Sequence, residues 1–436
     1  MQLEMFEASE YAEIKGSSVP EICSSLNLSE GNTEGCEYLG IVTENGIWKA
    51  SCYIGHVWLK KREVSLRVYP KPIIYGQDTD FFRMFLDSLS DAVVSKHLEN
   101  CYGILFDDPP IDAENSDNIT LFIIARYLKE LNDLSRRLMK QNFHRIEENL
   151  TGKIKGKILM HRQVSENIFC ARAHYATCSY QVITKDCIEN QVLKAALVLC
   201  CKYLTLHASS GLTVDGVLHQ WANNGKMALE GVTVRRVFPH DMRQAIAKSK
   251  GFFCTYQESL RLAEMIFRRL SFDPSADVDK IMSKCPPYWI NANELFERYC
   301  EVLLRKNINS ELWVGYQRNN MNSDIGMLRP DFLLPEKNAV LDAKYRRFYQ
   351  KKWGEWDDID RKKGKDNLQQ LSLYGRLDEV KRRLNNCEPE LIILYPVIGN
   401  KMNSINIDSD FREPARLFHN IYKIGVTVPT RISKNG

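Results

Sequence analysis

Two short apolar segments, residues 328–334 and 339–345, constrain the fold of this chain more than any other feature of its sequence. The four residues between them, Pro-Glu-Lys-Asn, can reverse the chain, so the two segments are expected to pair as antiparallel strands. Because side chains alternate along a strand, Asp342 and Lys344 are expected to point to the same face of the sheet. Asp331, on the neighbouring strand, is then expected to lie close to Asp342.

Two carboxylates and a lysine in this arrangement suit the hydrolysis of a phosphodiester. That reaction uses a divalent cation to neutralise the phosphate and to lower the pKa of the attacking water. Mg²⁺ prefers hard oxygen ligands, so the expected ligands are Asp331, Asp342 and the main-chain carbonyl of Ala343, with Mn²⁺ as an alternative ion. Lys344 can orient or deprotonate the water and offset developing negative charge.

An acidic residue two positions before a lysine is a weak signal by itself, because three other pairs in the chain share the spacing. These pairs are Glu13 with Lys15, Asp360 with Lys362, and Glu379 with Lys381. We interpret them as solvated surface pairs, the usual meaning of such spacing. The Asp342 pair differs because it ends an apolar strand and follows Asp331 at hairpin distance. The alternative is an ordinary ion pair between Asp342 and Lys344 on a hairpin edge.

The elements around the hairpin follow an order that favours a mixed sheet flanked by helices. The expected elements are a helix over 291–306, strands over 312–317, 328–334 and 339–345, a helix over 366–383, and a strand over 391–395. On the first helix, Glu297 borders the apolar stripe and could supply a third metal ligand; Glu294 is the weaker candidate. On the second helix, Gln370 is a polar residue among apolar neighbours. This order resembles the core of PD-(D/E)xK nucleases.

The segment from Lys344 to Lys365 carries nine basic and four acidic residues, a net charge of +5 in a chain whose formal total is +4. Basic residues beside a phosphodiesterase site are expected to contact the DNA backbone. The candidates for this contact are Arg346, Arg347, Lys351, Lys352, Lys362 and Lys363. A solvated loop is the alternative, and the interleaved aromatic side chains are expected to pack into the protein.

The whole chain, at 436 residues, is too long for one core and is expected to form two or three domains. The expected helices and strands predict an α/β protein, α+β overall, which we divide into three parts. Residues 1–115 are expected to form a β-rich amino-terminal domain. Residues 116–285 are expected to be mainly helical, with a β arm near 151–160. Residues 286–436 then form the nuclease domain.

Several other classes of site are not supported by the sequence. The thirteen cysteines include no Cys-x-x-Cys pair, so zinc is not expected and the thiols are expected to be free. No Gly-x-x-x-x-Gly-Lys-Ser/Thr loop is present, so this chain is not expected to bind a nucleotide. The chain shows neither a membrane-spanning apolar run nor a leader peptide, which predicts a cytoplasmic protein without a membrane partner.

Several motifs, taken in order, resemble the McrC family, the nuclease subunits of McrBC modification-dependent restriction systems. The motifs are Leu66-Arg-Val-Tyr-Pro-Lys71, Gly152-Lys-Ile-Lys-Gly-Lys-Ile158, Glu189-Asn-Gln-Val-Leu-Lys-Ala-Ala196, Asn293-Glu-Leu-Phe-Glu297, Arg329-Pro-Asp331, Asp342-Ala-Lys-Tyr345 and Gln370-Leu-x-x-Tyr374. The resemblance implies Asp331 and Asp342 as Mg²⁺ ligands and Lys344 as the catalytic lysine, with Glu297 and Gln370 in secondary roles.

The same resemblance implies partners. They are double-stranded DNA that carries a modified base and a hexameric, McrB-like AAA+ GTPase, which binds the GTP, translocates the DNA and recognises the modification. In the family, the amino-terminal part forms a stalk in the pore of the hexamer and stimulates GTP hydrolysis. Two other functions stay open: a stand-alone PD-(D/E)xK nuclease in DNA repair or recombination, and a non-cleaving activator of an AAA+ motor.

Overall fold

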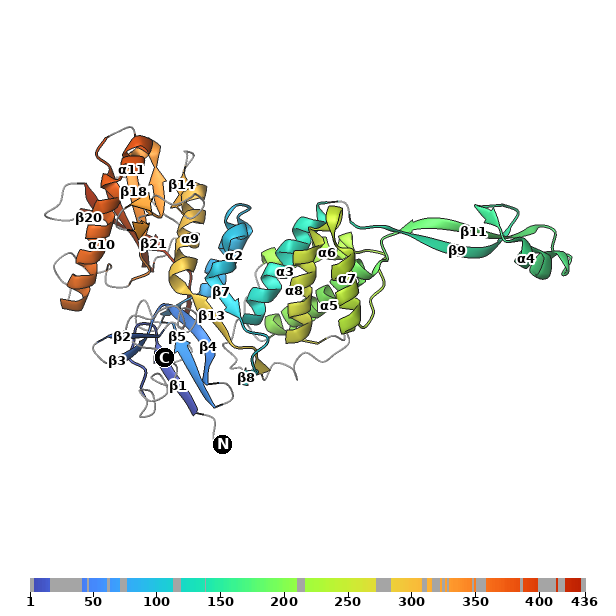
Figure 1. Cartoon of the computed structure of the whole chain (residues 1–436), viewed down its shortest axis with the longest axis horizontal. Coiled ribbons are helices and arrows are strands. Elements are labelled where there is room, and N and C mark those ends of the chain that lie inside the picture. Colours follow the sequence, from blue (N-terminus) through green and yellow to red (C-terminus); the bar gives the residue numbers. More distant parts are fainter. Residues whose placement is uncertain are drawn as a thin grey trace. The chain divides into compact units, whose positions relative to one another are not determined.

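The computed structural model divides the chain into two compact units, Met1–Asp112 with Pro286–Gly436, and Ala113–Cys285. The residues that the structure describes are 4–15, 41–44, 47–60, 63–70, 77–112, 119–137, 139–209, 216–271, 284–307, 312–315, 322–323, 326–327, 329–346, 349, 358–384, 387–398, 413–414 and 420–432. The chain is a mixture of helices and several sheets, which confirms the predicted α/β class (Figure 1).

A six-stranded mixed sheet forms the carboxy-terminal part of the first unit. Its strand order is β14 (Trp313–Val314), β17 (Phe332–Leu334), β18 (Ala339–Ala343), β19 (Glu390–Val397), β21 (Ile421–Thr427) and β20 (Glu413–Pro414). Strands β17 and β18 pair antiparallel, with Phe332 opposite Leu341, so the predicted hairpin is present. Strands β18, β19 and β21 run parallel. The sequence reading missed β21 entirely.

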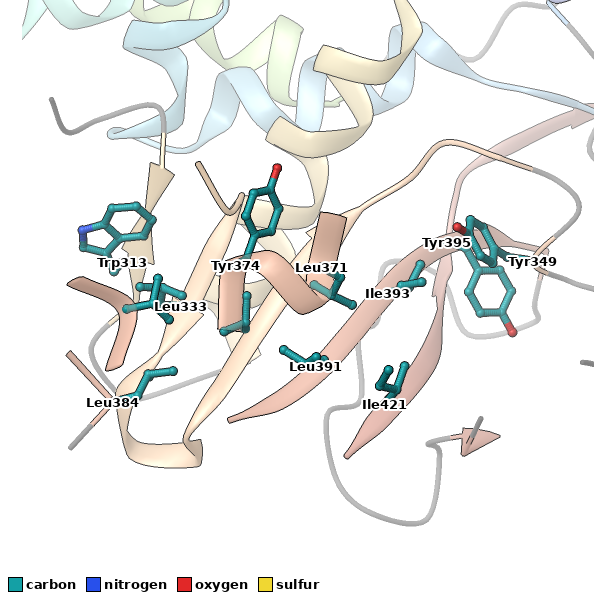
Figure 2. Packing of buried hydrophobic residues seen from close by; sticks show 12 residues of the cluster. Trp313, Leu333, Tyr349, Leu371, Tyr374, Leu384, Leu391, Ile393, Tyr395 and Ile421 are labelled. Carbon is teal, nitrogen blue, oxygen red and sulfur yellow. The ribbon is translucent and has the colours of Figure 1, made fainter. Parts of the chain in front are cut away.

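Helices pack on this sheet in the predicted order. Helix α9 (Ala292–Asn307) precedes the hairpin, and α10 (Asp358–Arg376) and α11 (Asp378–Arg383) follow it. The single helix expected over 366–383 is therefore two helices, because Leu377 between them has an extended backbone. Buried side chains of α10, among them Leu371 and Tyr374, pack with Leu333, Val340 and Ile393 of the sheet in one core (Figure 2). By strand alternation, Asp331, Asp342 and Lys344 share the face covered by α10.

The amino-terminal part of the first unit is built on a second sheet. Its strand order is β1 (Glu4–Ser9), β5 (Val64–Tyr69), β4 (Tyr53–Lys60), β13 (Tyr288–Asn291) and β7 (Tyr102–Ile104). Strands β2 (Ile41–Glu44) and β3 (Ile47–Ala50) pair antiparallel, and α2 (Phe81–Ser90) lies between β5 and β7 in sequence. Residues 288–291, which the predicted boundary assigned to the carboxy-terminal domain, pair here with both β4 and β7. This pairing explains why the two ends of the chain form one unit.

The second unit is a helical bundle that carries a β arm. The bundle helices are α3 (Ile119–Ser135), α5 (Ile188–Ser209), α6 (Gly216–Ala228), α7 (Pro239–Lys248) and α8 (Tyr256–Arg269). The arm pairs β9 (Asn142–Thr151) with β11 (Tyr175–Thr184) along their whole length and extends away from these helices (Figure 1). Its distal end holds β10 (Lys157–Ile158) and α4 (Met160–Gln163). The arm is therefore much longer than residues 151–160, which lie at its end.

Two further sequence expectations can be compared with the described residues. The eleven described cysteines are free thiols, as predicted, and six of them are buried. Among the described helices, none is both long and apolar enough to cross a membrane.

Candidate active site

The hairpin brings the three predicted residues together at the end of strand β18. Lys344 Nζ lies 2.8 Å from Asp342 Oδ2. Asp331 Oδ2 accepts a hydrogen bond of 2.7 Å from the main-chain N–H of Ala343, which fixes that carboxylate against the neighbouring strand. The main-chain N–H of Lys344 donates to the Leu394 carbonyl at 2.8 Å, so β19 holds the lysine in place.

The carboxylate of Asp342 is buried and incompletely satisfied. The residue is 1% exposed, and neither carboxylate oxygen accepts a well-directed hydrogen bond from the described residues. The Lys344 contact is therefore an ion pair by distance and not a well-aligned hydrogen bond. Buried carboxylate oxygens normally have a partner, and one without a protein donor is suited to a cation. Asp342 thus fits the metal that the sequence predicts.

Electrostatics also favour a cation between the carboxylates. Burial raises the pKa of Asp331 well above its ordinary value, and the charges of Glu297 and Asp342 raise it further. Lys344 and the N–H of Ala343 oppose this shift. Burial acts to lower the pKa of Lys344, but the charges of Asp342 and Asp331 outweigh it and raise the pKa, so the lysine stays protonated. Like charges concentrated in this way are stabilised by a bound cation.

Glu297 lies beside the site but is already paired. Helix α9 presents Arg298, 3% exposed, which binds Glu297 Oε1 at 2.8 Å and Glu294 Oε2 at 3.0 Å. Burial raises the pKa of Glu297, and the charge of Arg298 opposes the shift. Within the described ranges, no three His, Cys, Asp or Glu side chains meet closely enough to share a metal. Of the carboxylates expected to bind a metal, Asp331 and Asp342 are therefore the two that Arg298 does not pair.

Helix α10 adds two side chains to the site. Gln370 is half-buried, and its Nε2 donates to the hydroxyl of Tyr374 at 2.6 Å. Burial raises the pKa of Tyr374, and the charges of Asp342 and Asp331 raise it further. Sequence reasoning assigned no role to Tyr374, although its spacing of four residues from Gln370 places both on one helix face.

Arg329 is a second site residue that the sequence reading missed. It is exposed, and its charge lowers the pKa of both Glu297 and Tyr374. Its position two residues before Asp331 is the sequence feature that could have identified it as a neighbour of the site. The guanidinium therefore opposes the rise in the pKa of Glu297 and Tyr374 that burial causes.

The predicted DNA-contacting residues lie partly within the described chain. Arg346 is half-buried two residues after Lys344, and Lys362 is exposed and Lys363 half-buried in the first turns of α10. Arg347, Lys351 and Lys352 lie outside the described residues. One of the three other acid–lysine pairs with the same spacing, Glu379 with Lys381, lies on α11. There Glu379 forms ion pairs with Arg382 and Arg383 instead. That arrangement agrees with its interpretation as a helix surface.

Comparison with known proteins assigns the chain to a family. No curated protein matches it. A solved half-complex of the tetradecameric assembly of Thermococcus gammatolerans McrB AAA+ hexamers with bound McrC is similar over 99% of this chain and 96% of that chain, at 16% identity and a TM-score of 0.39. The cryo-EM structure of the Thermococcus gammatolerans McrBC complex is similar over 70% and 89%, at 15% identity and a TM-score of 0.31. The model of one family, described as "McrBC 5-methylcytosine restriction system component", matches residues 48–396. The chain belongs to this McrBC family, which confirms the predicted relationship.

Proposed function

We propose that this chain is the endonuclease subunit of a McrBC-type restriction system and hydrolyses DNA phosphodiesters in a Mg²⁺-dependent reaction. The observation that carries the proposal is the buried carboxylate of Asp342, whose oxygens lack directed hydrogen bonds while Lys344 Nζ lies 2.8 Å away. A structural ion pair would be expected to satisfy both oxygens. Membership of a restriction-system family supports DNA as the substrate.

The roles of the individual residues follow from their contacts. Asp331 and Asp342, with the carbonyl of Ala343, would hold the Mg²⁺ ion, or Mn²⁺ in its place. When bound, the ion supplies charge neutralisation at the phosphate and acidifies water. Lys344, kept protonated by the two carboxylates, stabilises negative charge that develops on the phosphate oxygens. The N–H of Ala343 keeps Asp331 oriented without using its second oxygen.

Glu297, Gln370 and Tyr374 support the site from the two helices. Glu297, oriented by Arg298, adds negative charge beside Asp331 and can bind a water of the hydrated ion, because Mg²⁺ usually keeps several waters. Gln370 fixes the Tyr374 hydroxyl, whose pKa the charges of both carboxylates raise. We therefore propose that this pair orients water or a phosphate oxygen.

The proposed partner is a McrB-like AAA+ GTPase hexamer. It would bind GTP, translocate the DNA and recognise the modified base, while this chain activates the GTPase and cuts. Family membership supports this division, and the sequence of this chain contains no phosphate-binding loop that would make it the motor.

One experiment separates this function from its alternatives. The purified chain is mixed with Mg²⁺ and methylated or unmethylated plasmid, with and without the GTPase encoded by the adjacent gene and GTP. The proposal requires cleavage only with GTPase and GTP, and loss of cleavage in Lys344→Ala. Cleavage by the chain alone would support a stand-alone nuclease. GTP turnover stimulated equally by wild type and Lys344→Ala, without cleavage by either, would support a non-cleaving activator.

A further inference from the structure

A cluster next to the candidate active site joins three distant parts of the sequence. Tyr11 lies in the turn after β1, Asn293 in the first turn of α9, and Lys363 near the start of α10. The Tyr11 hydroxyl donates to Asn293 Oδ1 at 3.2 Å. Lys363 Nζ lies 5.9 Å from the centre of the Tyr11 ring, within the range of a cation–π contact. A residue of the amino-terminal sheet therefore contacts both helices that flank the site.

The backbone at Tyr11 is held in an unusual conformation. Its φ of 58° is in the left-handed region, which non-glycine residues rarely adopt. Two main-chain hydrogen bonds hold this turn, from Ala12 to Ser9 at 3.0 Å and from Tyr11 to Ser51 at 3.4 Å. Such strained positions persist only where the surroundings fix them, and they are common at functional sites.

Arg346 connects this cluster to the catalytic residues. Its main-chain N–H donates to the Lys344 carbonyl at 2.7 Å, so its position is tied to that of the lysine. Burial raises the pKa of the Tyr11 hydroxyl, whereas the charge of Arg346 acts to lower it, so the guanidinium lies within electrostatic range of the ring. Arg346 is thus fixed to Lys344 through the backbone, and Tyr11 contacts Lys363 through its ring.

We propose that Arg346, Tyr11 and Lys363 form a phosphate-binding surface for the DNA strand beside the cleaved bond. Arg346 and Lys363 contact backbone phosphates, and Tyr11 is a positioning residue that holds Lys363 through its ring. Two cations adjoining a phosphodiesterase site complement the regular negative charge of a DNA strand. The inference rests on the proposed nuclease function and extends it, because it gives the amino-terminal sheet a part in DNA binding.

The test measures binding of a short fluorescent DNA duplex to the full-length chain in EDTA, over a series of salt concentrations. Arg346→Ala and Lys363→Ala should each weaken binding and reduce the slope of log K against log salt by about 0.9, as expected for one lost phosphate contact. Tyr11→Ala should resemble Lys363→Ala, whereas Tyr11→Phe keeps the ring and should restore the slope. Because Tyr11 acts through Lys363, the double variant Tyr11→Ala/Lys363→Ala should bind no more weakly than Lys363→Ala.

Two controls make the result decisive. Lys381→Ala removes an exposed lysine of α11, 18 residues along the chain from Lys363, and should leave the slope unchanged. Tyr69→Ala removes another tyrosine of the amino-terminal sheet, whose hydroxyl binds Glu7, and reports any general effect of disturbing that sheet. The inference is overturned if a folded Tyr11→Ala variant keeps the wild-type slope of log K against log salt. It is also overturned if the losses of DNA affinity in Tyr11→Ala and Lys363→Ala add up in the double variant. If the wild-type chain binds no duplex and cleaves none with the GTPase present, the proposed function itself fails.

Discussion

The side chain of Lys423, which has no exposed surface, donates a hydrogen bond of 2.9 Å from Nζ to the main-chain carbonyl of Tyr349. The lysine lies on β21, and its ammonium also forms an ion pair of 2.7 Å with the exposed carboxylate of Glu413. Tyr349 belongs to the basic segment that follows Lys344, and its hydroxyl accepts a hydrogen bond from Asn367 of α10. A buried lysine therefore fastens the segment between the candidate active site and α10 to the far strands of the sheet.

Lys423→Met is expected to destabilise the protein by about 1–3 kcal/mol, because it leaves the buried Tyr349 carbonyl without its donor. Glu413→Gln should cost less than about 1 kcal/mol, since that side chain is largely exposed and water can replace the ion pair. Urea denaturation of both variants measures the difference. Equal stability of Lys423→Met and the wild type would show that the hydrogen bond contributes nothing.

Lys344→Ala is expected to reduce the cleavage rate by roughly 10²–10³-fold, the usual effect of losing one charge-stabilising group at a reacting centre. The matched control is Lys381→Ala. It removes the lysine of Glu379 and Lys381, a pair with the same spacing as Asp342 and Lys344, and this variant should cleave DNA at the wild-type rate. Single-turnover cleavage of plasmid in the presence of the GTPase partner gives both rates. An equal loss of cleavage rate in the two variants would show that the effect comes from removing any positive charge and not from the position of Lys344.

Mg²⁺ is expected to raise the melting temperature of the wild-type chain, because a ligand that binds only the folded state stabilises it. Asp331→Asn should melt higher than the wild type in EDTA, since burial and the charges of Glu297 and Asp342 penalise its carboxylate, and Asp331→Asn/Asp342→Asn should not respond to Mg²⁺. Differential scanning calorimetry with and without Mg²⁺ measures both shifts. A double variant that still responds to Mg²⁺ would place the ion elsewhere.

The root of the arm contains a buried ion pair that should dominate the stability of the second unit. Lys140, just before β9, binds Glu189 Oε1 at 2.6 Å and the Lys248 carbonyl at 2.9 Å, and Glu189 has no exposed surface. Lys140→Met is expected to cost about 3–5 kcal/mol, because it leaves a buried carboxylate unpaired. Hydrogen exchange of the α5 and α8 amides reports this loss. Breaking the exposed pair of Arg268 with Glu264 on α8, by Arg268→Ala, should change exchange little.

Asp241 gives the second unit a stability that depends on pH. Burial alone would raise the pKa of this carboxyl, but hydrogen bonds from Arg235 and from the Phe238 N–H lower it. Because the folded-state pKa lies below the ordinary value, the stabilisation is present at neutral pH and is lost as the pH falls through the folded-state pKa. Asp241→Asn should therefore be less stable than the wild type at pH 7, with the gap closing in acid. A gap that is constant with pH would contradict this.

The predicted and observed folds agree best where the interactions are local. The hairpin of β17 and β18 and the helix α9 were predicted closely, because turn residues and apolar spacing lie within the segments themselves. The arm was placed too narrowly because β9 is exposed along nearly its whole length. A strand that buries almost none of its side chains shows no regular alternation of apolar and polar residues from which to recognise it.

By itself, the sequence determined the hairpin of β17 and β18 and the shared face of Asp331, Asp342 and Lys344, because side-chain direction on a strand follows from local geometry. Only the tertiary structure decided which distant segments pack around the candidate site. The pairing of β21 with β19, the pairing of β13 with β4, and the contact between Tyr11 and Lys363 all join residues far apart in the chain. Such contacts depend on the packing of whole elements, which no short-range pattern specifies.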